Sequence, residues 1–368
     1  MSDRAKLAKI VISGYYGFDN CGDEAVLLSI IHCLRKRRPD ASITVLSGNP
    51  EKTRQTYDVD AVNRWNPLGI ARAIMSCNLL ISGGGSLIQD VTSSRSPGYY
   101  LGVIRLGLFF RKKVMIYSQG VGPLTMKKNR ASAAKAFNRC LAIALRDSAS
   151  AELLRELGVE RDMVVTCDPV MALSREDVVG DPAAQKDLLR EVGISDSAGG
   201  TSRPLLFVSI RRWKDNRHIT PVAGLLDKQI AKGWDVLLVP AHYPGDMEAI
   251  SMLRDRMTAQ PYIVDKCLNA GEYLALAASA DKVFSMRLHG LICAMAMGTP
   301  MVGLSYDPKI DAFMEQAGME KFCLSFENVD LEAAQRMMDE QPPPLEPRRL
   351  EMRKLAWDTS DMADVLLP

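Results

Sequence analysis

The sequence has few of the patterns that mark metal sites and disulfide frameworks. Only four histidines occur, none in HxxxH or HxH spacing, and the eight cysteines include no CxxC pair. Metal sites commonly draw their ligands from such closely spaced pairs, so we expect no metal and no other cofactor. Several cysteines lie inside apolar runs, where reduced cysteine behaves as a small hydrophobe. We therefore expect a cytoplasmic protein without disulfides.

Long apolar runs and an excess of one charge are also absent. No stretch approaches the roughly 20 apolar residues of a spanning helix. The opening MSDRAKLAKIVISG leads directly into an expected strand, so we expect no signal peptide. Lys and Arg total 46 against 44 for Asp and Glu, a net charge of +2. This balance argues against nucleic-acid binding and makes any binding of anions a local property.

The chain does contain a regular alternation of short apolar runs and helical patterns. Expected strands at residues 9–13, 42–46, 78–82 and 113–118 are each followed by helical periodicity, and the alternation restarts at residue 205. This pattern predicts parallel sheets with right-handed crossovers. We expect an α/β fold of two Rossmann-like domains whose sheets face each other across a cleft. A single large α/β domain is the alternative at this length.

Breaks in the alternation set the expected boundaries. The polar stretch ISDSAGGTSRP and the later QPPP interrupt the periodic segments and are typical of surface loops. The expected organisation is a first domain, a linker region, a second domain and a C-terminal helix that packs back on the body, at residues 1–175, 176–204, 205–345 and 346–368.

The most informative motif is SMRLHG at residues 285–290, followed by a small-residue helix and a strand that leads to YDPK at residues 306–309. Arg287, His289 and Lys309 thus follow neighbouring strands at the carboxyl edge of a sheet, where open α/β folds bind ligands. The cluster predicts a site for a small, highly charged anion beside a titratable group. Surface ion pairs of the cations with Asp307 and Asp311 are the alternative.

The spacing within this motif also predicts its backbone. Arg287 and His289 lie two residues apart, so they share a side only in extended backbone. We therefore expect the helix to begin near Gly290, with its N-terminus directed at the anion. Arg211 and Arg212 end the expected strand at residues 205–210, and the alternation of strand side chains predicts that one faces the cleft and the other solvent.

Two glycine-containing motifs occur in the first half. SGYYGFDNCGDEA, at residues 13–25, lacks GxGxxG spacing, so the dinucleotide fingerprint fails. Asp23 and Glu24 at the expected helix start would repel a phosphate. We expect a neutral hydroxylated ligand, such as a sugar, contacted by Asn20, Asp23 or Glu24; simple capping of the helix is equally open.

The second such motif is ISGGGSLIQD at residues 81–90. Its glycines permit close approach of either a ligand or another element of the fold. Gln89 and Asp90 are candidates for contact with a sugar hydroxyl. A packing role for the glycines is the alternative.

SGYYGFDNCGDEA, ISGGGSLIQD, SQGVGP and, above all, RLHG with YDPK resemble the polysaccharide pyruvyltransferases of the CsaB type over nearly the whole chain. The resemblance implies a GT-B-like fold and transfer of pyruvate from phosphoenolpyruvate to a sugar, forming a 4,6-ketal and releasing phosphate. It implies β-ManNAc of a lipid-linked cell-wall precursor as acceptor, at the inner face of the plasma membrane. The phosphoenolpyruvate site that it implies comprises Arg287, Leu288, His289, Lys309 and one or both of Arg211 and Arg212.

On this interpretation His289 is the general acid and Arg287 its catalytic partner, while the base is open among Asp19, Asp23, Glu24 and Asp215. A nucleotide-sugar-dependent GT-B glycosyltransferase is the competing class. The helix LICAMAMG after His289 lacks the carboxylate expected near a donor ribose, which counts against it. A non-catalytic sugar-binding module would leave the cationic cluster unused. Residues 105–113 are a candidate for peripheral membrane contact or, alternatively, a core helix.

Overall fold

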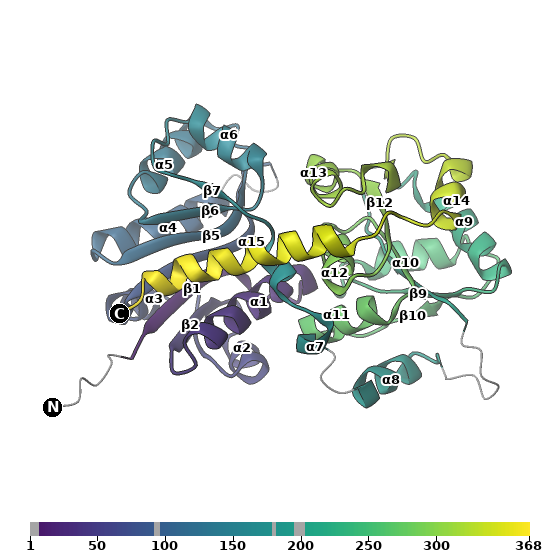
Figure 1. Ribbon diagram of the computed structural model, residues 1–368, viewed down its shortest axis with the longest axis horizontal. Helices are drawn as coiled ribbons and strands as arrows, with labels where there is room; N and C mark the ends of the chain where they lie inside the picture. The colour runs from purple at the N-terminus through teal and green to yellow at the C-terminus, as the bar shows by residue number, and fades with distance from the viewer. Residues whose placement is uncertain (1–6, 92–95, 179–181, 195–202) are drawn as a thin grey trace. The chain divides into compact units, whose positions relative to one another are not determined.

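The computed structural model describes residues 7–91, 96–178, 182–194 and 203–368, and these ranges form two α/β domains with parallel sheets (Figure 1). The first domain comprises Met1–Phe18, Asp23–Ala172 and Met352–Pro368. The second comprises Leu173–Glu351 together with the short segment Asp19–Gly22. Within the described ranges, none of the helices has the length and apolar character needed to cross a membrane.

The first domain is built on a sheet whose described strands follow the order β3-β2-β1-β4-β5-β6-β7. Strand β4 reads LLISGGGSLI and is buried almost throughout, as is usual for a parallel strand covered on both faces. The strand order reverses between β1 and β4, the kind of position at which open sheets bind ligands. The strands are β1 (Lys9–Tyr16), β2 (Ser42–Ser47), β3 (Asp60–Asn63), β4 (Leu79–Ile88), β5 (Lys113–Val121), β6 (Ala142–Leu145) and β7 (Val164–Val165).

Helices connect these strands, and several begin at recognisable caps. Asn49, Asn66 and Asp147 each accept a hydrogen bond from a backbone N–H in the first turn of the helix that follows, which satisfies one of its unpaired donors. The helices are α1 (Cys21–Arg37), α2 (Pro50–Tyr57), α3 (Pro67–Ser76), α4 (Ser96–Phe109), α5 (Lys127–Phe137) and α6 (Ser148–Glu156), with a 3₁₀ turn at Pro169–Ala172.

The second domain repeats the architecture with the strand order β10-β9-β8-β11-β12-β13 in its described part. Here the order reverses between β8 and β11. The strands are β8 (Leu205–Ser209), β9 (Asp235–Leu238), β10 (Tyr262–Ile263), β11 (Lys282–Ser285), β12 (Met301–Ser305) and β13 (Cys323–Ser325). The helices are α7 (Arg175–Val178), α8 (Pro182–Glu191), α9 (Ile219–Ala231), α10 (Met247–Arg254), α11 (Ala270–Ser279), α12 (Leu288–Met297), α13 (Pro308–Gln316) and α14 (Leu331–Asp339), with a 3₁₀ turn at Glu320–Phe322.

The range expected as a linker, residues 176–204, contains helix α8, in which Leu188 is buried. Gln185 of this helix donates a hydrogen bond to the carbonyl of Ala275 at 3.0 Å. Residues 195–202, which hold most of the polar stretch, lie outside the described part of the chain.

The C-terminal helix α15 (Glu346–Val365) contributes its later residues to the first domain. The Thr359 hydroxyl lies 3.1 Å from the hydroxyl of Ser118, and the thiol of Cys167 donates to the carbonyl of Met352. The guanidinium of Arg37 lies 5.0 Å from the centre of the Trp357 ring. These contacts make the end of the chain part of the first domain's packing.

Candidate active site

The second domain has a cavity of about 180 Å³ at the carboxyl ends of its strands. It is formed by residues that follow β9, β11 and β12, together with the segment Asp19–Gly22. The lining residues are Asn20, Gly22, Ala241, Arg287, Leu288, His289, Tyr306, Asp307, Lys309 and Ile310. The cavity thus lies beside the reversal of strand order, where an open α/β sheet is expected to bind its ligand.

The turn between β11 and α12 places Arg287 at the cavity. Ser285 directs this turn: its hydroxyl accepts the N–H of Arg287 at 3.0 Å and donates to the carbonyl of the same residue at 2.8 Å. Arg287 is the N-cap residue, with extended φ and ψ of −90° and 124°. A Cβ on Gly290 would lie 2.3 Å from the Ser285 hydroxyl. Glycine is therefore required for the close approach of α12 to the end of β11.

The expected helix start near Gly290 was wrong, because α12 begins at Leu288 and His289 occupies its first turn. Arg287 and His289 do not need to share extended backbone to reach the same cavity. The structure brings both to one cavity with Arg287 before the helix and His289 on it. The glycine that was interpreted as delaying the helix is instead a packing requirement.

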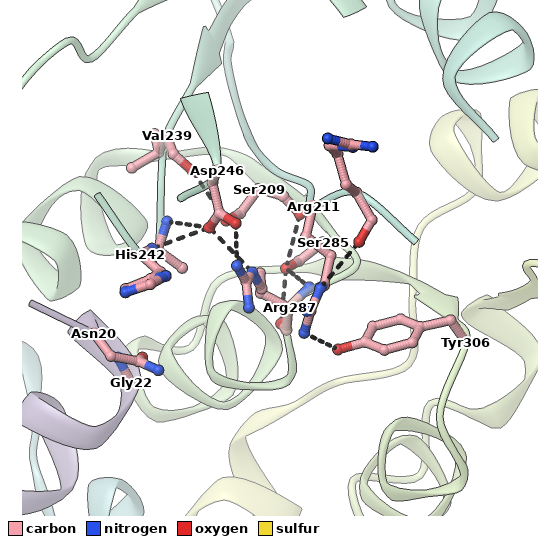
Figure 2. A network of polar contacts seen from close by, with 12 residues as sticks. Asn20, Gly22, Ser209, Arg211, Val239, His242, Asp246, Ser285, Arg287 and Tyr306 are labelled. Carbon is pink, nitrogen blue, oxygen red and sulfur yellow. Dashed lines mark hydrogen bonds and ion pairs between the residues drawn. The ribbon is translucent and has the colours of Figure 1, made fainter. Parts of the chain in front are cut away.

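A buried carboxylate that the sequence reasoning missed holds Arg287 in place (Figure 2). Asp246 is only 1% exposed and forms an ion pair with the Arg287 guanidinium, with 3.1 Å between Nε and Oδ2. The same Oδ2 accepts the backbone N–H groups of Ala241 and His242 at 3.1 and 3.0 Å. One carboxylate therefore fixes both the loop after β9 and the guanidinium beside the cavity.

His289 is positioned by close packing against the segment Asp19–Gly22. A Cβ on Gly22 would lie 2.4 Å from the imidazole Nδ1. Backbone hydrogen bonding holds this segment in the second domain: Cys21 N–H donates to the carbonyl of Ala241 at 2.8 Å, and Asn20 forms a bridge with His242. Asn20, expected among the acceptor residues of the first domain, thus lines the same cavity as Arg287 and His289.

Replacing Gly22 by alanine is expected to lower turnover about tenfold or more, because the new methyl group must displace the imidazole of His289 and small misplacements of reacting groups lower rates steeply. Gly102→Ala is the matched control. A Cβ at Gly102 meets no atom within 4 Å, and alanine favours the interior of a helix. Steady-state kinetics of both variants tests this expectation. Equal activity of G22A and G102A would show that Gly22 does not position the histidine.

The two adjacent arginines after β8 take different partners. Arg211 Nη1 donates to the Tyr306 hydroxyl at 3.2 Å, and Tyr306 lines the cavity (Figure 2). Arg212 forms an ion pair with Glu248, and both side chains are at least half exposed. Arg211 is therefore the arginine connected to the cavity, through the hydroxyl of Tyr306. Because Arg212 is held by Glu248, it can contact a ligand in the cavity only after this ion pair breaks.

Lys309 reaches the cavity from the first turn of α13. The N-cap residue of this helix, Asp307, accepts the backbone N–H of Lys309 at 3.0 Å. Asp311 accepts a hydrogen bond from the Ser305 hydroxyl at 2.7 Å. These two carboxylates, considered as ion-pair partners of the cations, thus form local hydrogen bonds that shape the turn. The N-termini of α12 and α13 add their positive dipole ends at the same edge.

Several residues expected to contact an acceptor have structural partners in the first domain. Glu24 accepts the N–H of Gly17 at 2.7 Å and the hydroxyl of Tyr57 at 2.6 Å. The side-chain oxygen of Gln89 accepts the N–H of Val91. The same applies to the glycine run: a Cβ on Gly84 would lie 2.7 Å from Val26. These contacts favour the packing and capping alternatives for Glu24, Gln89 and the glycine run.

Asp90 caps the start of helix α5 through its carboxylate. Thr125 donates to Oδ1 from both its N–H and its hydroxyl, at 2.8 and 3.0 Å. Met126 N–H and Asn129 Nδ2 donate to Oδ2 at 3.0 and 3.1 Å. Burial acts to raise the pKa of Asp90, but these hydrogen bonds outweigh it and lower the pKa to about 2. The carboxylate replaces the missing side-chain cap at Met126.

Asp90→Asn is expected to reduce the free energy of unfolding by about 2 kcal/mol at neutral pH. The NH₂ group of asparagine would face N–H or hydroxyl donors that now donate to a carboxylate oxygen. The lowered pKa makes the carboxylate's contribution complete above the unfolded value near 4 and lost as pH falls through about 2. The deficit of D90N should therefore shrink below about pH 4. Urea unfolding of both proteins across this range measures it, and a deficit independent of pH would contradict the capping role.

Asp215, one of the candidate bases, is held as an anion by Arg217. Both side chains are about half exposed, with 2.7 Å between Arg217 Nη2 and Asp215 Oδ2. Hydrogen bonds from the Arg217 side chain lower the pKa of Asp215 to about 2. A carboxylate with so low a pKa accepts protons poorly near neutral pH. The ion pair with Arg217 therefore makes Asp215 a weak candidate for the base.

Known structures share this two-domain architecture. The S. aureus MnaA–UDP structure is 11% identical, with a TM-score of 0.63 and coverage of 97% of this chain and 95% of that one. The structure of Anabaena Alr3699/HepE in complex with UDP-glucose is 15% identical, with a TM-score of 0.63 and coverage of 97% and 98%. At these identities the similarity shows the fold alone, which is of the GT-B type found in epimerases and glycosyltransferases.

Sequence comparison supplies the class of enzyme. The model of the family described as polysaccharide pyruvyl transferase matches residues 20–308, and the chain belongs to this family. It is therefore a transferase. A relative in Erwinia amylovora, the amylovoran biosynthesis protein AmsJ, is 23% identical over 362 residues, covering 84% of this chain and 86% of that protein. The matched range includes Asn20, Arg287 and His289 of the cavity.

Proposed function

We propose that this enzyme transfers pyruvate from phosphoenolpyruvate to two hydroxyls of a sugar, forming a 4,6-ketal and releasing phosphate. The observation that carries the proposal is the convergence of Arg287, His289 and Lys309 on one small cavity. Bound phosphate contributes roughly −1.5 to −2 charges near neutral pH, and the donor's carboxylate adds one more. Charge-assisted hydrogen bonds from arginine and lysine suit such a ligand.

The size of the cavity favours a compact donor. Its volume of about 180 Å³ lies below the roughly 300–1,000 Å³ of pockets that enclose drug-sized ligands. Phosphoenolpyruvate is small and has little apolar surface, whereas a nucleotide sugar needs room for a base and a ribose. Asp246 offsets part of the Arg287 charge, so Lys309 and the two helix N-termini supply the remaining attraction for the phosphate and carboxylate.

In the proposed reaction, His289 donates a proton to the methylene carbon of phosphoenolpyruvate while one sugar hydroxyl adds to the neighbouring carbon and loses its proton to a base. The C–O bond to phosphate then breaks, and the second hydroxyl closes the ketal ring and loses its proton. Arg287 holds the phosphate as it departs.

The acceptor is a saccharide of polysaccharide biosynthesis, and we propose β-ManNAc of a lipid-linked precursor as the first to test. Such a precursor would bring the enzyme to the inner face of the plasma membrane. The decisive assay incubates the enzyme with phosphoenolpyruvate and a synthetic β-ManNAc glycoside and measures inorganic phosphate and the ketal product. Release of nucleoside diphosphate from a sugar nucleotide, without use of phosphoenolpyruvate, would instead identify a glycosyltransferase.

A further inference from the structure

An arginine enclosed by aromatic rings lies at the carboxyl edge of the first domain's sheet. Arg64 follows β3 directly and is only 4% exposed. Its Nη1 donates to the carbonyl of Gly14 in β1 at 3.1 Å. The guanidinium carbon lies 4.2–6.0 Å from the centres of five aromatic rings, those of Tyr15, Phe18, Trp65, Tyr99 and Tyr100. We call these residues the Arg64 cluster.

The outer rings of the Arg64 cluster are open to solvent. Trp65 is 68% exposed and Tyr15 is 38% exposed. Tyr15 stacks on Phe18 with 4.3 Å between ring centres and 12° between planes. Rings that served only the core would be buried from solvent, because burial of large aromatic side chains contributes most to stability when it is complete. Exposed aromatic surface gathered over a rigid base is more typical of a binding site.

The charges around the Arg64 cluster favour a neutral ligand. The guanidinium is buried behind the rings, so it cannot meet a phosphate directly. The carboxylate of Asp23 is close enough to act on Tyr15: burial first, and then the Asp23 charge, raise the pKa of Tyr15. A negative group beside the platform repels anions but accepts hydrogen bonds from hydroxyls. A pyranose combines an apolar C–H face, which suits an aromatic ring, with hydroxyls at its edge.

We propose that Tyr15, Phe18 and Trp65 form a stacking platform for a pyranose ring of the acceptor glycan. Arg64 holds the rings in fixed planes through cation–π contacts, so little side-chain freedom is lost when a sugar binds. The identification of this sugar as the acceptor depends on the proposed function. Binding of a saccharide to the platform does not, because it requires neither phosphoenolpyruvate nor turnover.

Binding of methyl glycosides of N-acetylmannosamine, glucose and galactose, followed by saturation-transfer NMR and tryptophan fluorescence without donor, tests the platform. Trp65→Ala should weaken saccharide binding about tenfold or more, while Trp65→Phe, which keeps an aromatic face, should restore most of it. Phe109→Ala is the matched control. It removes a ring that is 76% exposed at the opposite end of α4 from Tyr99 and should leave binding unchanged.

Loss of saccharide binding in W65A, with binding kept in W65F and F109A, supports the platform. Failure of the enzyme to release phosphate from phosphoenolpyruvate would contradict only the proposed reaction. Equal binding by W65A and the wild-type protein overturns the platform. So does the absence of saccharide binding by the wild-type protein. A response of Trp65 to uridine diphosphate but to no saccharide would also overturn it, since the rings would then receive a nucleobase.

Discussion

His289→Ala is expected to lower kcat by about 10²–10⁴-fold, the range that a positioned general acid usually contributes. Phosphoenolpyruvate should still bind, because Lys309 and the N-termini of α12 and α13 remain at the cavity. Kinetics with saturating donor and acceptor, together with calorimetric titration of the donor, separates these two effects.

His289→Gln is the informative companion variant. Glutamine retains polar contact with the cavity but cannot deliver a proton as an imidazolium does, so it should be nearly as slow as alanine. Turnover by H289A or H289Q near that of the wild-type enzyme would exclude His289 as the acid. Loss of donor binding without loss of kcat would show that its role is recognition.

Asp246→Ala is expected to affect both catalysis and stability, because it leaves the guanidinium of Arg287 without its buried partner. The Arg287 side chain is 16% exposed and that of Asp246 only 1%. Breaking a buried ion pair in this way typically destabilises by about 3–5 kcal/mol. The freed Arg287 would also lose its orientation, so kcat/KM for phosphoenolpyruvate should fall about 100-fold or more.

The control for Asp246 is an exposed ion pair in the same domain. Glu327 contacts Lys214 at 2.6 Å, and both side chains are more than half exposed. Exposed pairs contribute about 1 kcal/mol or less, so Glu327→Gln should change neither stability nor kcat/KM appreciably. Asp246→Asn separates the effect of shape from that of charge, because asparagine keeps the shape of the side chain and lacks its negative charge. If D246A and E327Q behaved alike, Asp246 would not be the residue that positions Arg287.

The class of fold could be predicted from the sequence because apolar runs and helical periods alternate visibly along the chain, and parallel strands follow from that alternation. The cations at the strand ends were equally visible, since strand ends are marked by the change from apolar to polar residues. The start of α12 could not be predicted from the sequence. It depends on the Ser285 hydroxyl and on the space that Gly290 leaves for that hydroxyl.

Other parts of the site depend on contacts between residues distant in the sequence. Asp246 and Arg287 are 41 positions apart, and before the fold is known Asp246 is simply an acidic residue at a helix start. The sequence shows that Glu24 is a carboxylate near a turn, but it does not show the hydrogen bond that Glu24 accepts from the Tyr57 hydroxyl. Arg64 gave no signal because the rings around it come from three separate segments of the chain. Such tertiary contacts decide whether a polar residue binds a ligand or supports the fold.

The reaction in D₂O, with phosphoenolpyruvate labelled at its second carbon with ¹³C and a β-ManNAc glycoside as acceptor, tests the central claim most directly. We predict that phosphate appears together with a saccharide whose new ketal carbon carries the label, and that the new methyl group holds one deuterium delivered through His289. Release of phosphate with labelled free pyruvate and no labelled saccharide, or a labelled saccharide that retains an unprotonated methylene group, would contradict pyruvyl transfer by this site.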